Sequence, residues 1–146
     1  MFLGRFSHNL DDKGRLTVPA RFREQLEPDG AYVLQGFDRN LMVLPAATFQ
    51  SLSEKVHQMS MTNPDARQLR RLLYSTADRV DVDRAGRMLI PQFLRQAAGL
   101  EVNVVVVGNG DYFELWSPES WEIQDSQLQD AESTTSRFAD LLLPSE

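Results

Sequence analysis

The sequence contains no cysteine, so it cannot form disulfide bonds, thiol nucleophiles or cysteine-ligated zinc sites. It has two histidines, His8 and His57, which excludes a histidine-rich metal site. It also lacks a GxSxG nucleophile motif and a GxxxxGK[ST] phosphate-binding loop. The absence of cysteine fits a reducing cytoplasm. We therefore expect a cytoplasmic protein that uses no metal or other cofactor.

Long hydrophobic runs are missing as well. No apolar run reaches the about 18 residues that a membrane-spanning helix needs, and residues 102–107 have only the length of a strand. The first residues, MFLGRFSHNLDDKGR, lack both a sustained apolar region and a small-residue cleavage site. The sequence therefore predicts no export signal and no membrane span.

Basic side chains are scarce only in the last quarter of the chain. The net charge is −6, but residues 1–110 carry 14 basic and 12 acidic side chains, whereas residues 111–146 carry one basic and nine acidic. Thirteen of the 15 basic residues are arginine, the side chain best suited to bidentate contacts with phosphate or guanine. The overall acidity therefore does not exclude a nucleic-acid partner.

Nearly the same nine residues occur twice, as DDKGRLTVP from position 11 and DRAGRMLIP from position 83. With a constant offset of 72 and no gaps, the identical positions include one proline, two glycines and the spaced aspartate–arginine pair. The identical positions are Asp11/Asp83, Gly14/Gly86, Arg15/Arg87, Pro19/Pro91, Arg23/Arg95, Val33/Val105 and Gly36/Gly108. Apolar residues keep their phase throughout this alignment, which indicates a tandem duplication.

Each copy predicts the same order of elements. A short strand leads into a glycine turn, a second strand alternates apolar and polar residues, and a helix follows the proline. Two strands joined by a hairpin-like connector come next, at 32–35 and 41–44 and at 103–107 and 112–116. Further helices are expected after Pro45, from Asn63-Pro64 and after Pro118, the last capped by Ser117.

The small size of one copy predicts how the two copies assemble. A unit of about 45 residues is near the lower limit for an independent hydrophobic core. We therefore expect a mixed α+β fold in which both copies share one core, related by an approximate twofold axis. Both DxxGR turns should then lie on the same face.

The chemistry of the repeated turn suggests DNA binding. Asp11 and Asp83 can accept hydrogen bonds from the N–H groups of their turns and hold the guanidinium of Arg15 or Arg87. A guanidinium oriented by a carboxylate is a preorganised fork for phosphate oxygens or for guanine O6 and N7. Strand alternation directs Arg15 outward, away from Leu16. The structural alternative is a surface ion pair that only stabilises a hairpin.

The neighbouring basic residues supply further candidates. Lys13 and Arg84 lie inside the two turns and are predicted to join the DNA-binding set. Arg5, Arg21, Arg23 and Arg95 could add contacts to phosphate, and so could the helical cluster Arg67, Arg70 and Arg71.

Two other functions remain open at this stage. Asp11-Asp12 and Asp81-x-Asp83 could hold Mg²⁺ for phosphoester hydrolysis, although aspartate-rich surface turns favour a structural role. We therefore predict that the chain is not an enzyme. The second alternative is an antitoxin-type protein that binds its operator and neutralises a partner protein.

Several segments carry a resemblance to a known family. They are MFLGRFSHNLDDKGRLTVPARFRE, NPDARQLRRLLYSTA, DRAGRMLIP and VVVVGNGDYFELWSPESW. Over residues 1–122 the chain resembles the MraZ family of bacterial regulators, which are built from two AbrB-like (SpoVT-AbrB) domains. The resemblance implies a swapped-hairpin β-barrel fold, with DNA contacts from Asp11, Arg15, Asp83 and Arg87.

The resemblance also implies a function, partners and a domain organisation. It implies a transcriptional regulator that forms ring-like homo-oligomers and is associated with the nucleoid. The expected target is double-stranded DNA with repeated short boxes upstream of its own division and cell-wall gene cluster. The predicted organisation is a first domain at 5–52, connecting helices at 53–76, a second domain at 77–122 and an acidic tail at 123–146.

Overall fold

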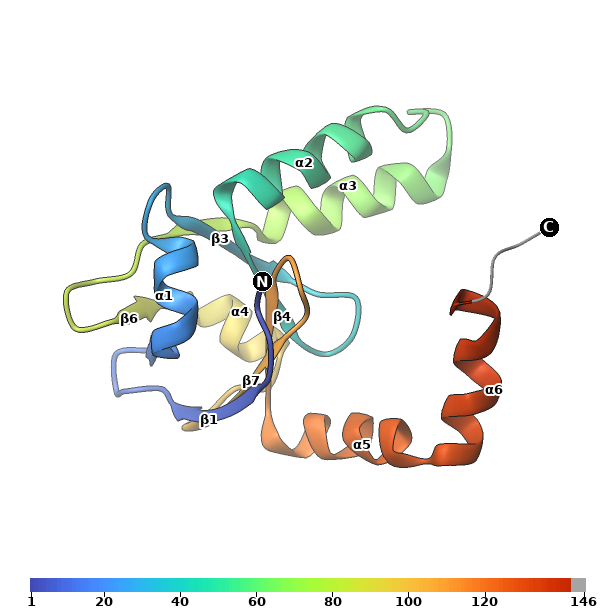
Figure 1. The fold of residues 1–146 in the computed structure, drawn as a ribbon. Helices are drawn as coiled ribbons and strands as arrows, with labels where there is room; N and C mark the ends of the chain where they lie inside the picture. The colour runs from blue at the N-terminus through green and yellow to red at the C-terminus, as the bar shows by residue number, and fades with distance from the viewer. Residues whose placement is uncertain (143–146) are drawn as a thin grey trace.

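The computed structural model describes residues 1–142 (Figure 1). In this range the chain forms strands β1 (Arg5–Asn9), β2 (Arg15–Thr17), β3 (Ala31–Gln35), β4 (Leu41–Pro45), β5 (Asp78–Val80), β6 (Arg87–Leu89), β7 (Asn103–Gly108) and β8 (Phe113–Trp116). The helices are α1 (Ala20–Leu26), α2 (Ala46–His57), α3 (Pro64–Thr76), α4 (Gln92–Ala97), α5 (Pro118–Gln129) and α6 (Ala131–Leu142). The last residues of the predicted tail, 143–146, lie outside the described range.

Local signals place the helix starts where the sequence predicts them. The Asn63 side chain accepts a hydrogen bond from the N–H of Asp65 at the start of α3. Ser117 likewise accepts a hydrogen bond from the N–H of Ser120 and caps α5. Such caps satisfy N–H groups that have no partner within the helix. Both predicted starts are confirmed.

The two copies exchange their first strands. The main sheet has the order β1-β7-β8-β4-β3-β5, so β1 of the first copy pairs with β7 of the second. The first strand of the second copy, β5, pairs in turn with β3 of the first. The remaining strands, β2 and β6, form a separate antiparallel pair, here called the β2–β6 ribbon. Neither copy can therefore complete its sheet alone.

An approximate twofold axis follows from the pairing registers. In the β2–β6 ribbon Leu16 lies opposite Met88, its equivalent at offset 72. In the main sheet Met42 lies opposite Glu114, which is again its equivalent. Residues paired with their own equivalents mark the positions where a twofold axis crosses a sheet. The predicted symmetry is confirmed at both places.

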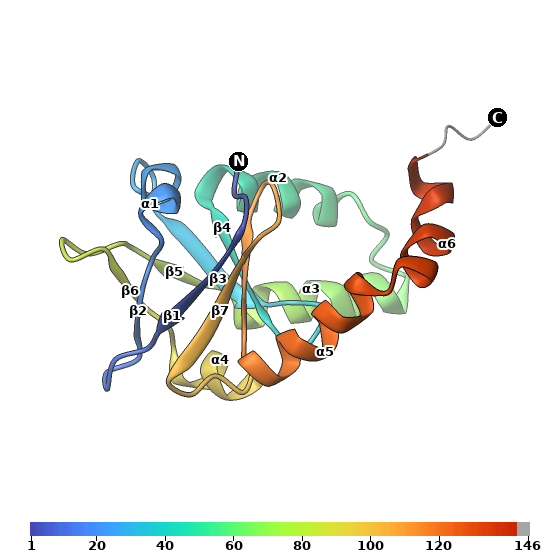
Figure 2. The ribbon, with the colours of Figure 1, turned by 60° about the horizontal axis from the view of Figure 1, so that its bottom comes forward.

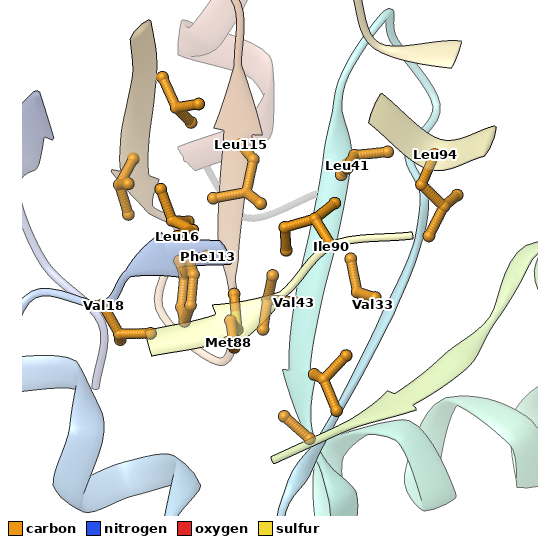
Figure 3. Packing of buried hydrophobic residues seen from close by; sticks show 14 of the residues in the cluster. Leu16, Val18, Val33, Leu41, Val43, Met88, Ile90, Leu94, Phe113 and Leu115 are labelled. Carbon is orange, nitrogen blue, oxygen red and sulfur yellow. The ribbon is translucent and has the colours of Figure 1, made fainter. Parts of the chain in front are cut away.

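One buried cluster joins the two copies (Figure 3). Leu16, Val18 and Phe22 of the first copy pack in it with their equivalents Met88, Ile90 and Leu94. An aromatic group adds specific contacts, with the ring of Phe22 lying 5.0 Å from that of Phe2 and 5.1 Å from that of Phe113. The prediction of a single core shared by both copies is confirmed.

The gap-free alignment of the two copies is wrong at one strand. It equates Val33 with Val105, yet Val33 is in the shared core whereas Val105 is not. The core residues of β7 are Val104 and Val106, so the structural offset there is 73. The offset returns to 72 at β8, because the β7–β8 connector is one residue shorter than the β3–β4 connector. A shift of one residue exchanges the two faces of a strand, so the equivalence of Gly36 with Gly108 is also wrong.

The opposite face of the main sheet is covered differently in the two copies. In the first copy α3 folds back beside α2, and both pack over β3 and β4 in a second cluster that contains Leu34, Leu44, Val56 and Leu73. In the second copy α5 matches α2 in its bounds at offset 72, but α6 extends away from the body (Figures 1 and 2). The link before α3 spans residues 58–63, whereas Asp130 alone separates α5 from α6.

These observations confirm the mixed α+β class and the tandem repeat. Among the described residues, β1 and β5 are the two edge strands of the main sheet and do not pair with each other. The sheet is therefore open, and closure into a barrel is not shown. Within residues 1–142, no helix is both long and apolar enough to cross a membrane.

Candidate nucleic-acid interface

The two repeated turns fold in the same way. In the first, the N–H of Asp11 donates to the carbonyl of Arg15 at 3.0 Å, and the N–H of Gly14 donates to the carbonyl of Asp11 at 3.0 Å. The second turn repeats these bonds at 2.8 and 3.0 Å, between Asp83 and Arg87 and between Gly86 and Asp83. The glycines have φ angles of +83° and +78°, a region that L-residues rarely adopt. Glycine is therefore required where each turn re-enters its strand.

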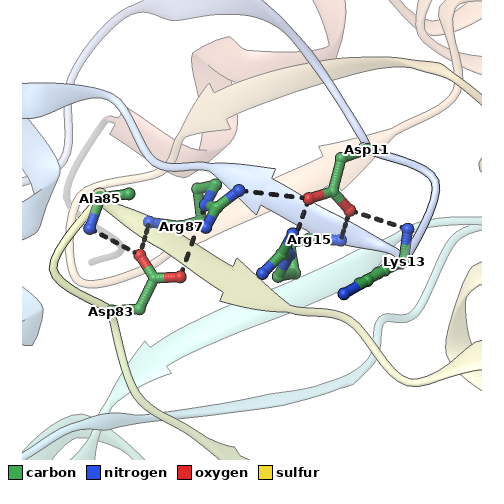
Figure 4. A network of polar contacts seen from close by, with 6 residues as sticks. All are labelled: Asp11, Lys13, Arg15, Asp83, Ala85 and Arg87. Carbon is green, nitrogen blue, oxygen red and sulfur yellow. Dashed lines mark hydrogen bonds and ion pairs between the residues drawn. The ribbon is translucent and has the colours of Figure 1, made fainter.

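Asp11 organises the first turn and contacts both strand arginines (Figure 4). Its Oδ1 accepts the backbone N–H groups of Lys13 at 3.0 Å and Arg15 at 2.8 Å. Its Oδ2 accepts Nε of Arg15 at 2.7 Å and a terminal nitrogen of Arg87 at 3.5 Å. One carboxylate thus holds the loop and two guanidinium groups.

Asp83 holds only its own loop and its own arginine. Its Oδ1 accepts the N–H groups of Ala85 and Arg87, both at 2.9 Å. Its Oδ2 lies 3.4 Å from Nε of Arg87, within ion-pair distance but without hydrogen-bond geometry, since that buried nitrogen has no hydrogen-bond partner among the described residues. The second turn is therefore held less tightly than the first.

Both carboxylates are stabilised in the ionised form. The N–H of Arg15 contributes most to lowering the pKa of Asp11, with further contributions from the Arg15 side chain and the Lys13 N–H. The N–H of Arg87 does the same for the pKa of Asp83. Hydrogen bonds to a charged form and nearby opposite charges both lower a carboxyl pKa. At neutral pH each carboxylate is therefore charged and able to orient an arginine.

The outer face of the β2–β6 ribbon consists of four side chains. Arg15 lies opposite Leu89 and Thr17 lies opposite Arg87, while Leu16 and Met88 point into the core. The two arginine side chains are 30% and 32% exposed, so they are accessible although each is held by a carboxylate. The sequence-based expectation that Arg15 points outward is confirmed.

Two further arginines support the turns from behind. Nε of Arg23 donates to the carbonyl of Val18 at 2.9 Å, and Nε of Arg95 donates to the carbonyl of Ile90 at 3.0 Å. The guanidinium of Arg95 lies against Gly14 of the first turn, and that of Arg23 lies against Gly86 of the second. Each turn is therefore packed against an arginine from the other copy.

The six predicted site residues thus occupy two kinds of position. Asp11, Arg15, Asp83 and Arg87 form one polar network across the ribbon. Lys13 and Arg84 lie in the two turns, and within residues 1–142 neither side chain has a hydrogen bond or ion pair. Their side chains are exposed, so they flank the network without joining it.

Two of the other candidate phosphate contacts, Arg5 and Arg67, are engaged elsewhere. Arg5 forms an ion pair with Asp125 at 2.9 Å and lies 5.4 Å from the ring of Trp121, which ties α5 to β1. Arg67, in the first turn of α3, donates to the carbonyl of Met61 at 3.0 Å. These arginines stabilise the fold rather than extend the ribbon face.

The carboxylates considered for Mg²⁺ do not gather into a metal site. Among residues 1–142, no group of three aspartate, glutamate, histidine or cysteine side chains could hold a metal ion. Asp11 and Asp83 are instead occupied by N–H groups and arginines. Their arrangement therefore supports the two loops.

The sequence suggested phosphate contacts for Arg23 and Arg95, whereas the structure places both behind the turns. Their identity at offset 72 was the available signal for this shared role. Thr17 and Leu89 occupy equivalent positions but differ in chemistry, so the repeat gave no signal for them.

Comparison with known proteins matches both halves of the chain to one family. A family model described as "MraZ protein, putative antitoxin-like" matches the chain twice, over residues 1–72 and 73–143. The chain is 47% identical over 143 residues to a "Transcriptional regulator MraZ" of Thermomicrobium roseum (strain ATCC 27502 / DSM 5159 / P-2), covering 97% of this chain and all of that one. A protein of the same name from Roseiflexus castenholzii (strain DSM 13941 / HLO8) is 42% identical over 142 residues, covering 97% and 96% of the two chains. A third, from Corynebacterium jeikeium (strain K411), is 46% identical over 121 residues, covering 83% and 84%.

The family model and the first two relatives therefore cover nearly the whole chain. All three relatives are named as regulators of transcription, not as enzymes. This chain, with its two tandem MraZ domains, belongs to the MraZ family of transcriptional regulators.

Proposed function

We propose that this protein binds double-stranded DNA sequence-specifically through the β2–β6 ribbon and thereby regulates transcription. The carrying observation is that Arg15 and Arg87 share one accessible face, where Asp11 and Asp83 hold them. These four residues make the principal contacts. Lys13 and Arg84, exposed in the two turns, add contacts to phosphate.

The geometry of the ribbon suits the major groove of DNA. The groove is about 12 Å wide and accepts a two-stranded β-ribbon. Asp11 engages Arg15 through Nε, which leaves the terminal nitrogens of that guanidinium to donate to guanine O6 and N7 or to a phosphate. A fork that is already oriented loses less side-chain entropy on binding than a free one.

Assembly into a ring-like homo-oligomer forms the second part of the proposal. The ribbon lies at one end of the molecule and the α5–α6 arm at the other (Figure 2). Head-to-tail contacts between such ends generate a ring when the rotation closes. Repeated ribbons could then bind directly repeated boxes, with a gain in affinity from effective concentration.

The remaining parts of the proposal rest on family membership. The targets are short boxes upstream of the protein's own division and cell-wall gene cluster, and the protein acts in the cytoplasm at the nucleoid. The exchange of β1 and β5 between the copies supports a barrel of the swapped-hairpin AbrB type. The division into domains at 5–52 and 77–122, linking helices at 53–76 and an acidic tail from 123 stays a prediction.

The proposal is tested by removing both ribbon arginines. We expect Arg15→Ala combined with Arg87→Ala to lower affinity for the fragment upstream of the protein's own gene by about 30-fold or more. The measurement is a gel shift repeated over a range of salt concentrations. Because phosphate contacts release counterions, the variant should also show a shallower dependence on salt.

Arg70→Ala combined with Arg71→Ala is the matched control. This pair removes the same charge from α3, which covers the opposite face of the main sheet. Equal loss of affinity in both double variants would show that binding follows net charge, and the ribbon would not be the site. The mass of the oligomer should be unchanged in both.

A second candidate function is that of an operator-binding antitoxin which also neutralises a partner protein. The α6 helix favours it, because Leu141 and Leu142 are 79% and 84% exposed on an element that extends away from the body. Stoichiometric recovery of another protein from the native host would support this function. Recovery of the homo-oligomer alone would count against it.

A further inference from the structure

We infer that Leu89 is a specificity-determining residue that contacts the methyl group of a thymine beside the base pair bound by Arg15. This inference rests on the proposed function of the β2–β6 ribbon. It assigns a role to an exposed apolar side chain that the arginine network does not use.

The position of Leu89 follows from the ribbon register. Arg15 lies opposite Leu89 and Thr17 opposite Arg87, so the four side chains form the corners of one outward patch. The arginines occupy one diagonal of this patch, and Leu89 and Thr17 occupy the other. Side chains directly opposite in an antiparallel pair have Cβ atoms about 4.5–5.5 Å apart. Leu89 therefore lies next to Arg15 on the outward face of the ribbon, so DNA bound by Arg15 would pass close to Leu89.

The chemistry of Leu89 limits what it can recognise. Its side chain is 55% exposed and cannot form a hydrogen bond. In the major groove, the C5 methyl group of thymine is the apolar feature among the base edges. Successive base pairs are about 3.4 Å apart along the axis, so a side chain beside a guanine-binding fork reaches the neighbouring base pair. Contact between Leu89 and a thymine methyl would remove both apolar groups from water.

The opposite corner has a different chemistry. Thr17 is the equivalent of Leu89 at offset 72, but it offers both a methyl and a hydroxyl group. The backbone of the ribbon is nearly twofold symmetric, whereas this pair of side chains is not. A symmetric ribbon would favour a palindromic site. The difference between Leu89 and Thr17 therefore favours a non-palindromic box with a directional thymine contact.

The test uses replacement of thymine by deoxyuridine, which removes only the methyl group. The wild-type protein first selects its box from a pool of random-sequence duplexes, and each thymine of that box is then replaced in turn. We expect one replacement to weaken wild-type binding about fourfold. Leu89→Ala should lose this sensitivity and bind the thymine and deoxyuridine duplexes equally. Leu89→Gln, which keeps a side chain of similar length, should behave in the same way.

Thr17→Ala is the matched control, because it shortens the side chain at the equivalent position of the first copy. It should retain the wild-type sensitivity at the thymine assigned to Leu89. Thermal unfolding and the mass of the oligomer should be unchanged in all three variants. A change in oligomer mass on Leu89→Ala would place Leu89 in a subunit contact and overturn the inference.

The remaining outcomes separate this inference from the proposed function. If the wild type enriches no sequence, DNA recognition fails and the thymine contact fails with it. If a box is enriched but the Arg15 and Arg87 double variant binds it equally well, the ribbon is not the site and both proposals fall. If binding requires the arginines but no thymine replacement matters, or if Leu89→Ala keeps the sensitivity, only the thymine contact is overturned.

Discussion

The Asp11 carboxylate carries more of the site than its counterpart Asp83. Asp11 contacts Arg15 and Arg87, whereas Asp83 contacts only Arg87. Because Arg87 lies between the two carboxylates, losing Asp83 still leaves it one charged neighbour. Losing Asp11 removes the ion-pair partner of Arg15 and weakens the restraint on Arg87. The two copies of the motif are therefore similar in sequence but unequal in the way they orient their arginines.

We expect Asp11→Asn to reduce specific DNA binding more than Asp83→Asn does. Asparagine keeps an oxygen that accepts the loop N–H groups but loses the charge that orients the guanidinium. Partly exposed ion pairs are weak, so the expected loss is about twofold to fivefold for each arginine released. The measurement is the ratio of affinities for the selected box and for a random duplex.

The ratio matters because removing a negative charge also strengthens non-specific attraction to DNA. A larger effect of Asp83→Asn, or equal effects of both variants, would contradict the unequal roles of the two carboxylates.

The fixed position of the β2–β6 ribbon depends on contacts between the two copies. The N–H of Val18 donates to the carbonyl of Gly86 at 2.8 Å, and the N–H of Ile90 donates to the carbonyl of Gly14 at 2.9 Å. Arg95 packs on Gly14 from behind. Each turn is thus fixed both by its own aspartate and by the other copy. This support makes the ribbon a rigid platform for its outward side chains.

We expect Gly14→Ala to destabilise the protein more than Gly110→Ala. The φ angles are alike, +83° and +82°, so both substitutions carry a left-handed backbone penalty of about 1–2 kcal/mol. A Cβ atom at Gly14 would in addition lie 2.7 Å from Cζ of Arg95, whereas a Cβ at Gly110 meets nothing within 4 Å. Denaturant unfolding of the two variants measures the difference. Equal free energies of unfolding would show that Arg95 moves aside without cost.

The position of the α6 helix is the largest difference between the second copy and the first. In the first copy α3 folds back beside α2 and covers the sheet, but α6 turns away from the body (Figure 1). Leu141 and Leu142 remain exposed on it. An apolar helix end held away from its own domain is suited to contact a neighbouring subunit.

We expect a chain that ends at Asp130 to form smaller assemblies than the full chain. Its subunits should still fold, because α6 contributes nothing to either buried cluster among the described residues. On DNA with several boxes the affinity should fall about 100-fold through loss of avidity, but on a single box it should be unchanged. Sedimentation and gel shifts on both DNAs measure these effects.

Leu141→Asp combined with Leu142→Asp tests the same helix without removing it. This variant should also form smaller assemblies, since charged side chains would oppose burial in a subunit contact. Unchanged assembly mass in both variants would exclude α6 from the contacts between subunits.

The sequence by itself determined the features that depend on neighbours a few residues apart. The bonds from Asp11 and Asp83 to the turn N–H groups join residues two to four positions apart, as do the caps at Asn63 and Ser117. The outward direction of Arg15 follows from strand alternation alone. The duplication also predicted one core for both copies, because a single copy is too small to bury enough apolar surface.

Only the tertiary structure decided the features that depend on distant partners. The exchange of β1 and β5, the ion pair of Asp11 with Arg87 and the packing of Arg95 on Gly14 all join residues 45 or more positions apart. The register of β7 also required the structure, because one extra residue before the strand is compensated within the following connector. Alternation in sequence predicts that a strand has two faces, but only the packed sheet decides which face enters the core.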